Sequence, residues 1–218
     1  MKILSRIIAF MVIIAISPLL LTLCILCLLF QGRPIFYSQI RIGYKFKPFM
    51  IYKFRSMSQD SSIKINTSNN NPQITPWGRF MRKFKFDELP QLYNILKGDM
   101  RFIGPRPELP DYVIKTEFRF LNKFPPGLSD YSSILLIDES SIISSDFSYS
   151  DLLKLKNSLA NYYVTNKSFV LDLKLVFLTM IAVIFPRFVA SNFIMPIVSK
   201  IAPEWEKKVK EKILLAYA

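Results

Sequence analysis

The chain of 218 residues carries 29 Lys and Arg against 16 Asp and Glu, for a net charge of +13, and 51% of its residues are hydrophobic. This length suits one domain plus an anchor, and the hydrophobic content favours association with a membrane. Histidine is absent from the sequence. A Ser-His-Asp triad, histidine proton transfer and histidine-ligated zinc are therefore excluded, and any enzymatic chemistry must use carboxylate, Lys, Arg, Ser or Tyr side chains.

Positive charge is concentrated at the start of the chain, where residues 1–59 hold eight Lys or Arg and no acid. This asymmetry indicates a polyanionic partner. Nucleic acid, anionic lipid headgroups and phosphorylated substrates all fit, and charge alone does not choose among them.

The first predicted element is an apolar segment of 26 uncharged residues between Arg6 and Arg33. As a straight helix it is about 39 Å long, enough to cross a hydrocarbon core of about 30 Å. Ser17-Pro18 lies near its middle, where proline removes an internal hydrogen bond and kinks the axis. Positive charge flanks both ends, and a re-entrant helix broken at Ser17-Pro18 keeps both flanks on one side, as the positive-inside rule requires. A straight span that exports Lys2 and Arg6 is the alternative, and the residues alone do not choose between the two.

Two short runs rich in aromatic and β-branched residues, 34–40 and 49–54, follow the anchor and predict a hairpin. Lys53 and Arg55 alternate with aromatic residues, which predicts one strand face for both. The basic and aromatic mixture suits stacking on a nucleic-acid strand or a place among lipid headgroups. The adjacent apolar segment favours the membrane.

Residues 57–76 are rich in Ser, Asn and Gln and lack an apolar period, which predicts a surface loop. Residues 77–86 return to a basic amphipathic pattern that includes Arg82. This pattern predicts a helix along the membrane surface, and a solvated, charged helix face is the alternative.

The stretch 85–107, KFKFDELPQLYNILKGDMRFIGPRP, places two adjacent carboxylates, Asp87 and Glu88, at the start of a predicted helix. Apolar residues recur at helical spacing over 88–97, and Gly98 is a typical stop signal. Asp87 is the predicted N-cap, and the proline that follows is tolerated in the first turn.

Cations surround the two carboxylates in sequence, and the turn Gly104-Pro105-Arg106-Pro107 fixes one guanidinium in a direction that suits phosphate. Two ionised acids in such surroundings are able to hold a divalent cation beside a phosphate, or one acid is able to attack phosphorus. An acidic N-cap solvated among surface charges is the simpler interpretation. The cations within twenty residues of Asp87 are Arg79, Arg82, Lys83, Lys85, Lys97, Arg101 and Arg106.

Several blocks of this sequence occur in an order that is typical of one family. They are Arg33-Pro34-Ile35-Phe36, Gln39, Gly43, Tyr52-Lys53-Phe54-Arg55-Ser56-Met57, Asp87-Glu88-Leu89-Pro90-Gln91-Leu92, Leu96-Lys97-Gly98-Asp99-Met100 and Phe102-Ile103-Gly104-Pro105-Arg106-Pro107. Together they resemble the signature of the bacterial sugar transferases, the monotopic phosphoglycosyl transferases. The resemblance covers about residues 1 to 185, apart from the segment after Gly127. It also favours the re-entrant form of the apolar segment, because members of the family resemble this chain in having a Ser-Pro break there.

The resemblance implies transfer of a phospho-sugar from a nucleotide-diphosphate sugar, expected to be a UDP-sugar, to a polyprenyl phosphate, expected to be undecaprenyl phosphate. It implies a covalent intermediate on Asp87, Glu88 as the second catalytic residue, and Mg²⁺ held by both. Arg106, Lys53 and Arg82 are the expected phosphate-binding residues. Adjacent carboxylates do not flank a sugar as the two acids of a glycosidase do, which argues against hydrolysis.

The chain departs from the family after Gly127. A helical period predicts a helix over 111–124 that stops before the Pro-Pro-Gly turn. Much of the family then has a block ending in Asn-Gly-Arg-Asn, whose arginine resembles a substrate contact. Here residues 128–139 contain no arginine, and Ser129-Asp130 and Asp138-Glu139 mark either different donor recognition or a loss of activity.

Three further helices are predicted towards the C-terminus. The first is capped by Ser150 and runs to Tyr163, the second covers 169–185, and the third covers 204–215. The uncharged part of the second helix is too short to span a membrane, so it is either core or dipped into the interface. The side chains of the first helix predicted to face inward are Leu152, Leu155, Leu159 and Tyr162.

The sequence therefore predicts an α/β, mainly helical protein with a re-entrant membrane anchor, 1–32, and a small membrane-surface catalytic domain, 33–218, built of short strands and amphipathic helices. Its expected place is the cytoplasmic face of the bacterial inner membrane, and its expected function is initiation of membrane-bound glycan synthesis. The expected partners are a nucleotide-activated sugar, a polyprenyl phosphate and the membrane, without nucleic acid. The alternative is a non-catalytic or degenerate basic protein that binds anionic lipid or nucleic acid.

Overall fold

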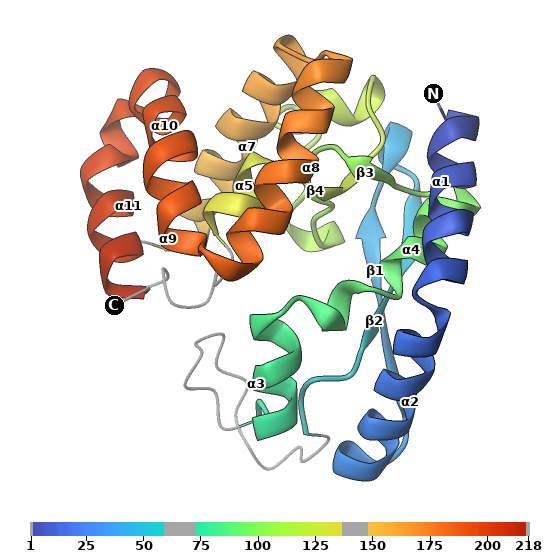
Figure 1. Cartoon of the computed structure of the whole chain (residues 1–218). Coiled ribbons are helices and arrows are strands. Elements are labelled where there is room, and N and C mark those ends of the chain that lie inside the picture. The colour runs from blue at the N-terminus through green and yellow to red at the C-terminus, as the bar shows by residue number, and fades with distance from the viewer. Residues whose placement is uncertain (1, 59–72, 137–147, 217–218) are drawn as a thin grey trace.

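The computed structural model describes residues 2–58, 73–136 and 148–216 (Figure 1). Within these ranges the chain is mainly helical, with four short strands in two pairs, which confirms the predicted class. Most of the loop predicted at 57–76 and the pair Asp138-Glu139 lie outside the described residues.

The apolar N-terminal segment forms two helices, α1 (Lys2–Ala15) and α2 (Ser17–Gln31), bent by 64° at their junction. Pro18 lies in the first turn of α2, and the Ser17 hydroxyl donates a hydrogen bond of 2.8 Å to the carbonyl of Ile14. In the described part of the chain no single helix has the length and apolar composition to cross a membrane, whereas this bent pair meets both criteria together. The break therefore lies where the sequence predicts it, and its placement in a membrane stays a prediction.

The predicted hairpin is confirmed. Strands β1 (Phe36–Ile42) and β2 (Pro48–Phe54) pair antiparallel over their full length, with Phe36 opposite Phe54. Strand β2 is in contact with residues 86–88, which include the two carboxylates, and Lys53 is the next-to-last residue of this strand.

Helices α3 (Pro76–Lys83) and α4 (Gln91–Lys97) join the anchor to the hairpin through two buried clusters. One cluster combines α1, β2 and α4, and the other combines α2, β2 and α3. The anchor is thus packed along the catalytic domain (Figure 1). The first cluster contains Ala9, Ile51, Leu92, Ile95 and Met100, and the second contains Leu23, Cys27, Phe54 and Met81.

Two arginines connect the N-terminal helices to the rest of the chain, each at the C-terminus of a helix. Arg6 of α1 donates hydrogen bonds of 2.8 and 2.7 Å to the carbonyls of Leu96 and Lys97, the last turn of α4. Arg55, just after β2, donates to the carbonyls of Gln31 and Gly32 at the end of α2. Each guanidinium satisfies carbonyls that have no intrahelical partner at a helix C-terminus, where positive charge is also favourable.

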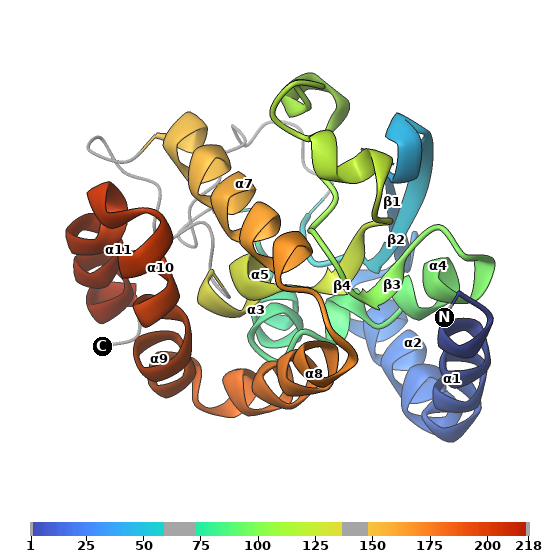
Figure 2. The same cartoon turned by 90° about the horizontal axis from the view of Figure 1, so that it is seen from above.

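The other half of the molecule is a helical layer around the main hydrophobic core (Figures 1 and 2). Strand β3 (Arg101–Ile103), which is part of the signature stretch 85–107, pairs in parallel with β4 (Gly127–Ser129). The helices are α5 (Tyr131–Leu135), α7 (Tyr149–Thr165), α8 (Phe169–Ile184), α9 (Pro186–Val189), a π-helical turn (Ala190–Ile194), α10 (Met195–Ile201) and α11 (Pro203–Ala216).

The helix predicted over 111–124 is wrong. The segment contains only two short 3₁₀ turns, Pro110–Tyr112 and Arg119–Asn122. Phe118, Phe120 and Leu121 are all buried. Phe120 would point away from the face that Phe118 and Leu121 share in an α-helix, so burial of all three side chains overrides the helical period.

The helix predicted from Ser150 exists, but its cap is Ser148, whose hydroxyl accepts from the Asp151 N–H while the Asp151 carboxylate accepts from the Ser148 N–H. This reciprocal capping box satisfies two donors, which a cap at Ser150 does not offer. Leu152, Leu155 and Leu159 are buried as predicted, whereas Tyr163 rather than Tyr162 completes the inward face.

Because Arg6 donates hydrogen bonds to the carbonyls of Leu96 and Lys97, we expect Arg6→Ala to loosen the last turn of α4. Loss of its hydrogen bonds should lower the free energy of unfolding by roughly 0.5 to 1.5 kcal/mol. Amide hydrogen exchange in detergent should become faster at Gly98 and in α4. Arg33→Ala is the matched control, because Arg33 also flanks the anchor but is exposed and has no hydrogen bond or ion pair in the described structure. Equal exchange in the two variants would contradict this role of Arg6.

Candidate active site

The two carboxylates lie in a 3₁₀ turn, Phe86–Glu88, that precedes α4. The predicted helix start at Glu88, with Asp87 as its N-cap, is therefore wrong. Pro90 has no N–H to donate to the Phe86 carbonyl in an α-helical bond, so that carbonyl accepts from Leu89 at 3.2 Å instead. The predicted end of the helix at Gly98 is confirmed, since Gly98 adopts a left-handed conformation with φ of 90°.

Glu88 is held by two cations from distant parts of the chain. Its Oε1 accepts from the Lys53 ammonium at 2.7 Å and from the Arg106 guanidinium at 2.9 Å, and the residue is only 9% exposed. Burial by itself raises the pKa of Glu88, but Arg106, Lys53 and Lys85 outweigh that effect and hold this pKa well below its usual range. Glu88 is therefore an ionised anchor for two cations.

Asp87 is buried without any such partner. It is 6% exposed, no hydrogen bond or ion pair joins its carboxylate to another described residue, and its Oδ1 is fully buried and unpartnered. Burial raises the pKa of Asp87, against the opposing charge of Lys53. Burial also lowers the pKa of the neighbouring Lys85. Adjacent acids thus have opposite surroundings: Glu88 is paired with two cations, and Asp87 has no direct partner.

Arg82 approaches the same region from α3. Its Nε donates a hydrogen bond of 2.8 Å to the Ser56 hydroxyl, and its charge acts on Asp87. The structure thus brings together Asp87, Glu88, Lys53, Arg82 and Arg106, which the sequence singled out across 54 residues of chain. Ser17 and Pro18 lie at the bend of the anchor, apart from this cluster.

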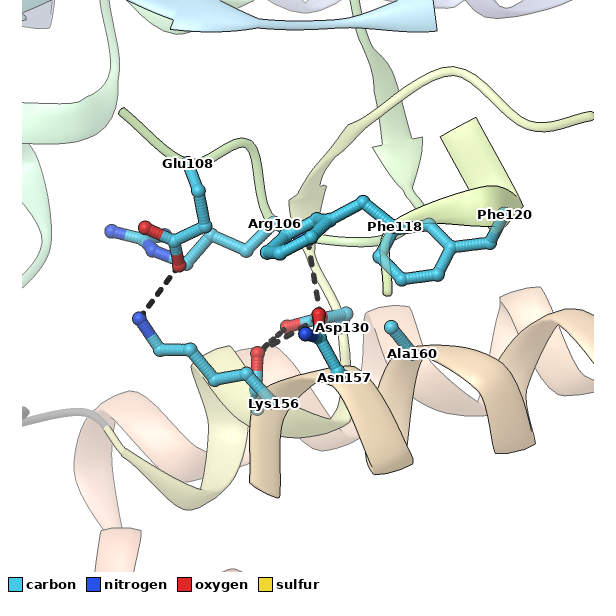
Figure 3. A pocket seen from close by; sticks show the side chains of 9 residues that line it. Arg106, Glu108, Phe118, Phe120, Asp130, Lys156, Asn157 and Ala160 are labelled. Atoms are coloured by element: carbon cyan, nitrogen blue, oxygen red, sulfur yellow. Dashed lines mark hydrogen bonds and ion pairs between the residues drawn. The ribbon is translucent and has the colours of Figure 1, made fainter. Parts of the chain in front are cut away.

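The backbone of Arg106 is supported by a residue that the sequence interpreted differently. Asp130 is 2% exposed and accepts hydrogen bonds from the Arg106 N–H at 3.2 Å and the Ser133 N–H at 2.7 Å (Figure 3). The Asp130 carboxylate therefore caps α5 and, at the same time, holds the turn that contains Arg106. The predicted change of substrate contact at Asp130 stays a prediction, but its carboxylate already has these structural partners.

A buried ion pair supports the same turn from the other side of a small cavity of about 10 Å³, room for about one water molecule (Figure 3). Glu108 is 3% exposed and accepts from the Lys156 ammonium at 2.8 Å, and Arg41 lies 3.5 Å away. Sequence reasoning missed Glu108 and Lys156. The only available signal was an acid directly after the Pro-Arg-Pro turn, and nothing in sequence spacing pairs it with a lysine 48 residues later.

The carboxylates fit a magnesium ion in part. Within the described ranges no three His, Cys, Asp or Glu side chains come together. Magnesium commonly takes one or two carboxylates and completes its shell with water and substrate phosphates. The unpartnered Asp87 oxygen beside Glu88 suits that arrangement.

Residues 1–186 match the family model described as Bacterial sugar transferase. The chain belongs to the bacterial sugar transferase family. This match confirms the resemblance found in the sequence blocks. In this member of the family, the two carboxylates of the signature stretch are buried among cations. Residues 187–216, beyond the matched region, contribute Val189, Ile194 and Val198 to the main core.

Three relatives illustrate the similarity. The chain is 39% identical over 150 residues to the uncharacterized sugar transferase EpsL of Bacillus subtilis, covering 68% of this chain and 69% of that protein. It is 33% identical over 170 residues to the UDP-N-acetylgalactosamine-undecaprenyl-phosphate N-acetylgalactosaminephosphotransferase of Aeromonas hydrophila, covering 75% and 38%. It is 30% identical over 185 residues to the UDP-glucose:undecaprenyl-phosphate glucose-1-phosphate transferase of Klebsiella pneumoniae, covering 79% and 37%. The chain thus spans little more than a third of the last two.

The contrast between the two acids predicts opposite effects on stability. Glu88→Gln leaves two cations without their anion and should lower the free energy of unfolding at neutral pH by roughly 1.5 to 3 kcal/mol. Asp87→Asn removes a buried, unpaired charge and should leave the melting temperature unchanged or raise it. Thermal unfolding of both variants in the same detergent measures the difference.

The pH dependence gives the control for this prediction. Because folding lowers the pKa of Glu88, its stabilisation is complete above the ordinary value of 4.5 and disappears as pH falls through the lower folded value. The difference in unfolding free energy between wild type and Glu88→Gln should therefore become smaller at acid pH. A difference that is constant from pH 7 to pH 3 would contradict the ion pairs.

The buried pair of Glu108 and Lys156 predicts a second stability effect. Lys156→Met keeps the side-chain volume but leaves Glu108 with Arg41 as its remaining cation, beside the Tyr149 hydroxyl, and should cost about 3 kcal/mol of unfolding free energy, the low end for breaking a buried pair. Lys154→Met, at an exposed position of the same helix, is the control and should have little effect. Denaturant unfolding of both variants provides the measurement, and similar midpoints would contradict the argument.

Proposed function

We propose that this protein transfers a phospho-sugar from a UDP-sugar to undecaprenyl phosphate through a covalent intermediate on Asp87, and so initiates membrane-bound glycan synthesis. The observation that carries the proposal is the environment of Asp87, a buried carboxylate without a partner beside Glu88, which binds two cations. The relatives named for UDP-N-acetylgalactosamine or UDP-glucose and undecaprenyl phosphate support the class of donor and acceptor.

The chemistry divides into two displacements at phosphorus. In the first, an oxygen of Asp87 bonds to the β-phosphorus of the donor, and the nucleoside monophosphate leaves with the electron pair of the broken P–O bond. In the second, an oxygen of the lipid phosphate bonds to the same phosphorus and the Asp87–phosphorus bond breaks. The products are a polyprenyl diphosphate sugar and a regenerated carboxylate.

The surrounding charges have separate roles in this proposal. Arg106, Lys53 and Arg82 supply positive charge to the donor phosphates, and Glu88 holds the first two in place. The low pKa of Glu88 supports a role in holding cations rather than in donating a proton. Mg²⁺ held by Asp87 and Glu88 would add positive charge beside the transferring phosphoryl group.

The proposed location is the cytoplasmic face of the inner membrane, with α1 and α2 as a re-entrant anchor. Both helices expose apolar side chains, with Ile3 and Leu29 each 72% exposed. Helix α8 exposes Phe169, Val170 and Ile184, and it lies along the same edge of the molecule as the anchor (Figure 2). An anchor of this kind raises the effective concentration of a phosphate confined to lipid headgroups.

The test is a donor assay with the full chain in detergent, Mg²⁺ and undecaprenyl phosphate. Wild type should release UMP from at least one of UDP-glucose, UDP-galactose and UDP-N-acetylgalactosamine, and should show a phospho-sugar adduct by intact-protein mass spectrometry. Asp87→Asn should lose UMP release by at least roughly a thousandfold and lose the adduct, because the nucleophile is gone.

Asp111→Asn, at an exposed position, controls for the loss of a negative charge and should keep both activities. Addition of EDTA should stop UMP release, and added Mg²⁺ should restore it. An adduct that persists in Asp87→Asn would refute the nucleophile. Salt-dependent binding of anionic vesicles by wild type without turnover of any donor would favour the non-catalytic alternative.

A further inference from the structure

Five aromatic side chains form a continuous row that begins at the end of α2 and reaches the turn of the two carboxylates. The Phe30 ring stacks on Trp77 with 5.3 Å between centroids, and Trp77 stacks on Phe80 at 5.2 Å. Phe80 then contacts Phe84 at 5.0 Å and Phe86 at 6.0 Å. Phe86 is the first residue of the 3₁₀ turn that holds both carboxylates. We call these five residues the aromatic row.

Helix α3, which is in contact with α2 at the same end of the molecule, carries the middle of the row (Figure 1). Met81 is fully buried on one face of α3, and Arg79 is exposed on the side away from it. Trp77, Phe80 and Phe84 follow one another at spacings of three and four residues, so they lie along a third face. The row is therefore a surface feature aligned with the helix.

The inner rings of the row are fixed by the fold, and the outer rings are accessible. The Trp77 Nε1–H donates to the Cys27 Sγ at 3.3 Å. Trp77 and Phe86 both pack against the buried cluster that combines α2, β2 and α3. Phe30, in contrast, is 65% exposed and Phe80 is 42% exposed. The row thus offers ring surfaces to a ligand while its backing is held rigidly.

Positive charge lies where the row reaches the carboxylates. The Lys83 ammonium is 5.8 Å from the centre of the Phe84 ring. The charges of Lys53 and Arg82 act on the carboxylate of Asp87, the residue that follows the row. Cations of this kind favour a phosphate. An apolar surface that leads to a group of cations suits a ligand with a long apolar chain and an anionic end.

Another exposed aromatic pair shows what an ordinary surface contact looks like. Phe188 of α9 and Phe193 of the π-helical turn are 56% and 37% exposed, and their ring centroids are 6.0 Å apart. In the described part of the chain this pair contacts no third aromatic ring. Aromatic residues are favoured among lipid headgroups, but that preference requires no connected row. The continuity of the aromatic row therefore calls for a separate explanation.

We propose that the aromatic row binds the isoprenoid chain of the polyprenyl phosphate acceptor and so guides its phosphate to Asp87. This inference rests on the proposed function, which supplies an acceptor with one apolar chain and one phosphate. Membrane lipid is as apolar as this chain, so the hydrophobic effect does not draw the chain from lipid onto protein. Packing on rigid rings does, because the planar double bonds of an isoprenoid chain lie flat on ring faces, unlike the tetrahedral carbons of an acyl chain.

The first experiment measures binding without turnover, through the fluorescence of Trp77. The chain has two tryptophans, so Trp205→Phe leaves Trp77 as the only one. Titration of this variant in micelles with undecaprenyl phosphate should change the Trp77 emission until it saturates. Phosphatidylglycerol, which is also anionic, should not reproduce the change. Adding Phe30→Ala should raise the half-saturating concentration roughly 2- to 10-fold, the range for loss of one aromatic contact. Phe80→Leu should act in the same direction.

The second experiment separates the two half-reactions. Without acceptor, Phe30→Ala should form the phospho-sugar adduct from UDP-glucose or UDP-N-acetylgalactosamine at the wild-type rate, because the donor does not touch the row. Transfer of the adduct to subsaturating undecaprenyl phosphate should slow by the factor measured for binding. Geranyl phosphate has a chain too short to extend from Asp87 along the row to Phe30. With this acceptor, wild type and Phe30→Ala should therefore not differ.

Phe188→Ala is the matched control, since it removes an exposed, ring-contacting phenylalanine outside the row, and it should match wild type in both experiments. An equal response of Trp77 to phosphatidylglycerol, or an equal loss in Phe188→Ala, would indicate general lipid contact and overturn the proposal. Unchanged affinity in both Phe30→Ala and Phe80→Leu would also overturn it. If wild type forms no adduct from any donor, the proposed function fails, whereas the Trp77 titration still decides whether the row binds the acceptor.

Discussion

The ion pairs of Glu88 with Lys53 and Arg106 are the interaction on which the arrangement of the site depends. They join the 3₁₀ turn to the end of β2 and to the turn after β3. Because Glu88 binds both cations, the next carboxylate, on Asp87, is left unpaired inside the same positive field. Glu88 holds the two cations in place by direct ion pairs. Asp87 lies in the positive potential of the same region without a direct ion pair to either cation. An unpaired carboxylate and a cation cluster can therefore coexist in adjacent residues.

The N-terminal helices α1 and α2 are part of this architecture. Arg6 reaches from α1 to the end of α4, while Arg55 reaches from the catalytic domain to the end of α2. The apolar cluster of Ala9 with Leu92 and Ile95 lies between the anchor and α4. Helix α1 is therefore in direct contact with the helix that begins just after the two carboxylates.

The sequence was sufficient for the parts that depend on local rules, such as the break at Ser17, the hairpin and the stop at Gly98. It also indicated Asp87, Glu88 and Arg106 as charged site residues, because one short stretch brings them together, whereas Lys53 and Arg82 were expected from the resemblance to the family. It failed where long-range packing decides, as in 111–124, where burial of Phe118 and its neighbours replaces a helix. Pairings such as Glu108 with Lys156 have no local signal either, since only the fold brings those side chains together.

The segment after Gly127 is where the chain differs from much of its family, and the structure gives that difference a physical meaning. Asp130 caps α5 and holds the Arg106 N–H, while Ser129 shares a hydrogen bond with Thr179 of α8 at 2.7 Å. Residues that replace the family pattern therefore fix the turn that points Arg106 at Glu88. A buried carboxylate costs stability unless hydrogen bonds compensate for the loss of water, and Asp130 obtains them from the Arg106 N–H and from the start of α5. The altered segment thus gives the Arg106 turn a support that comes from within the fold.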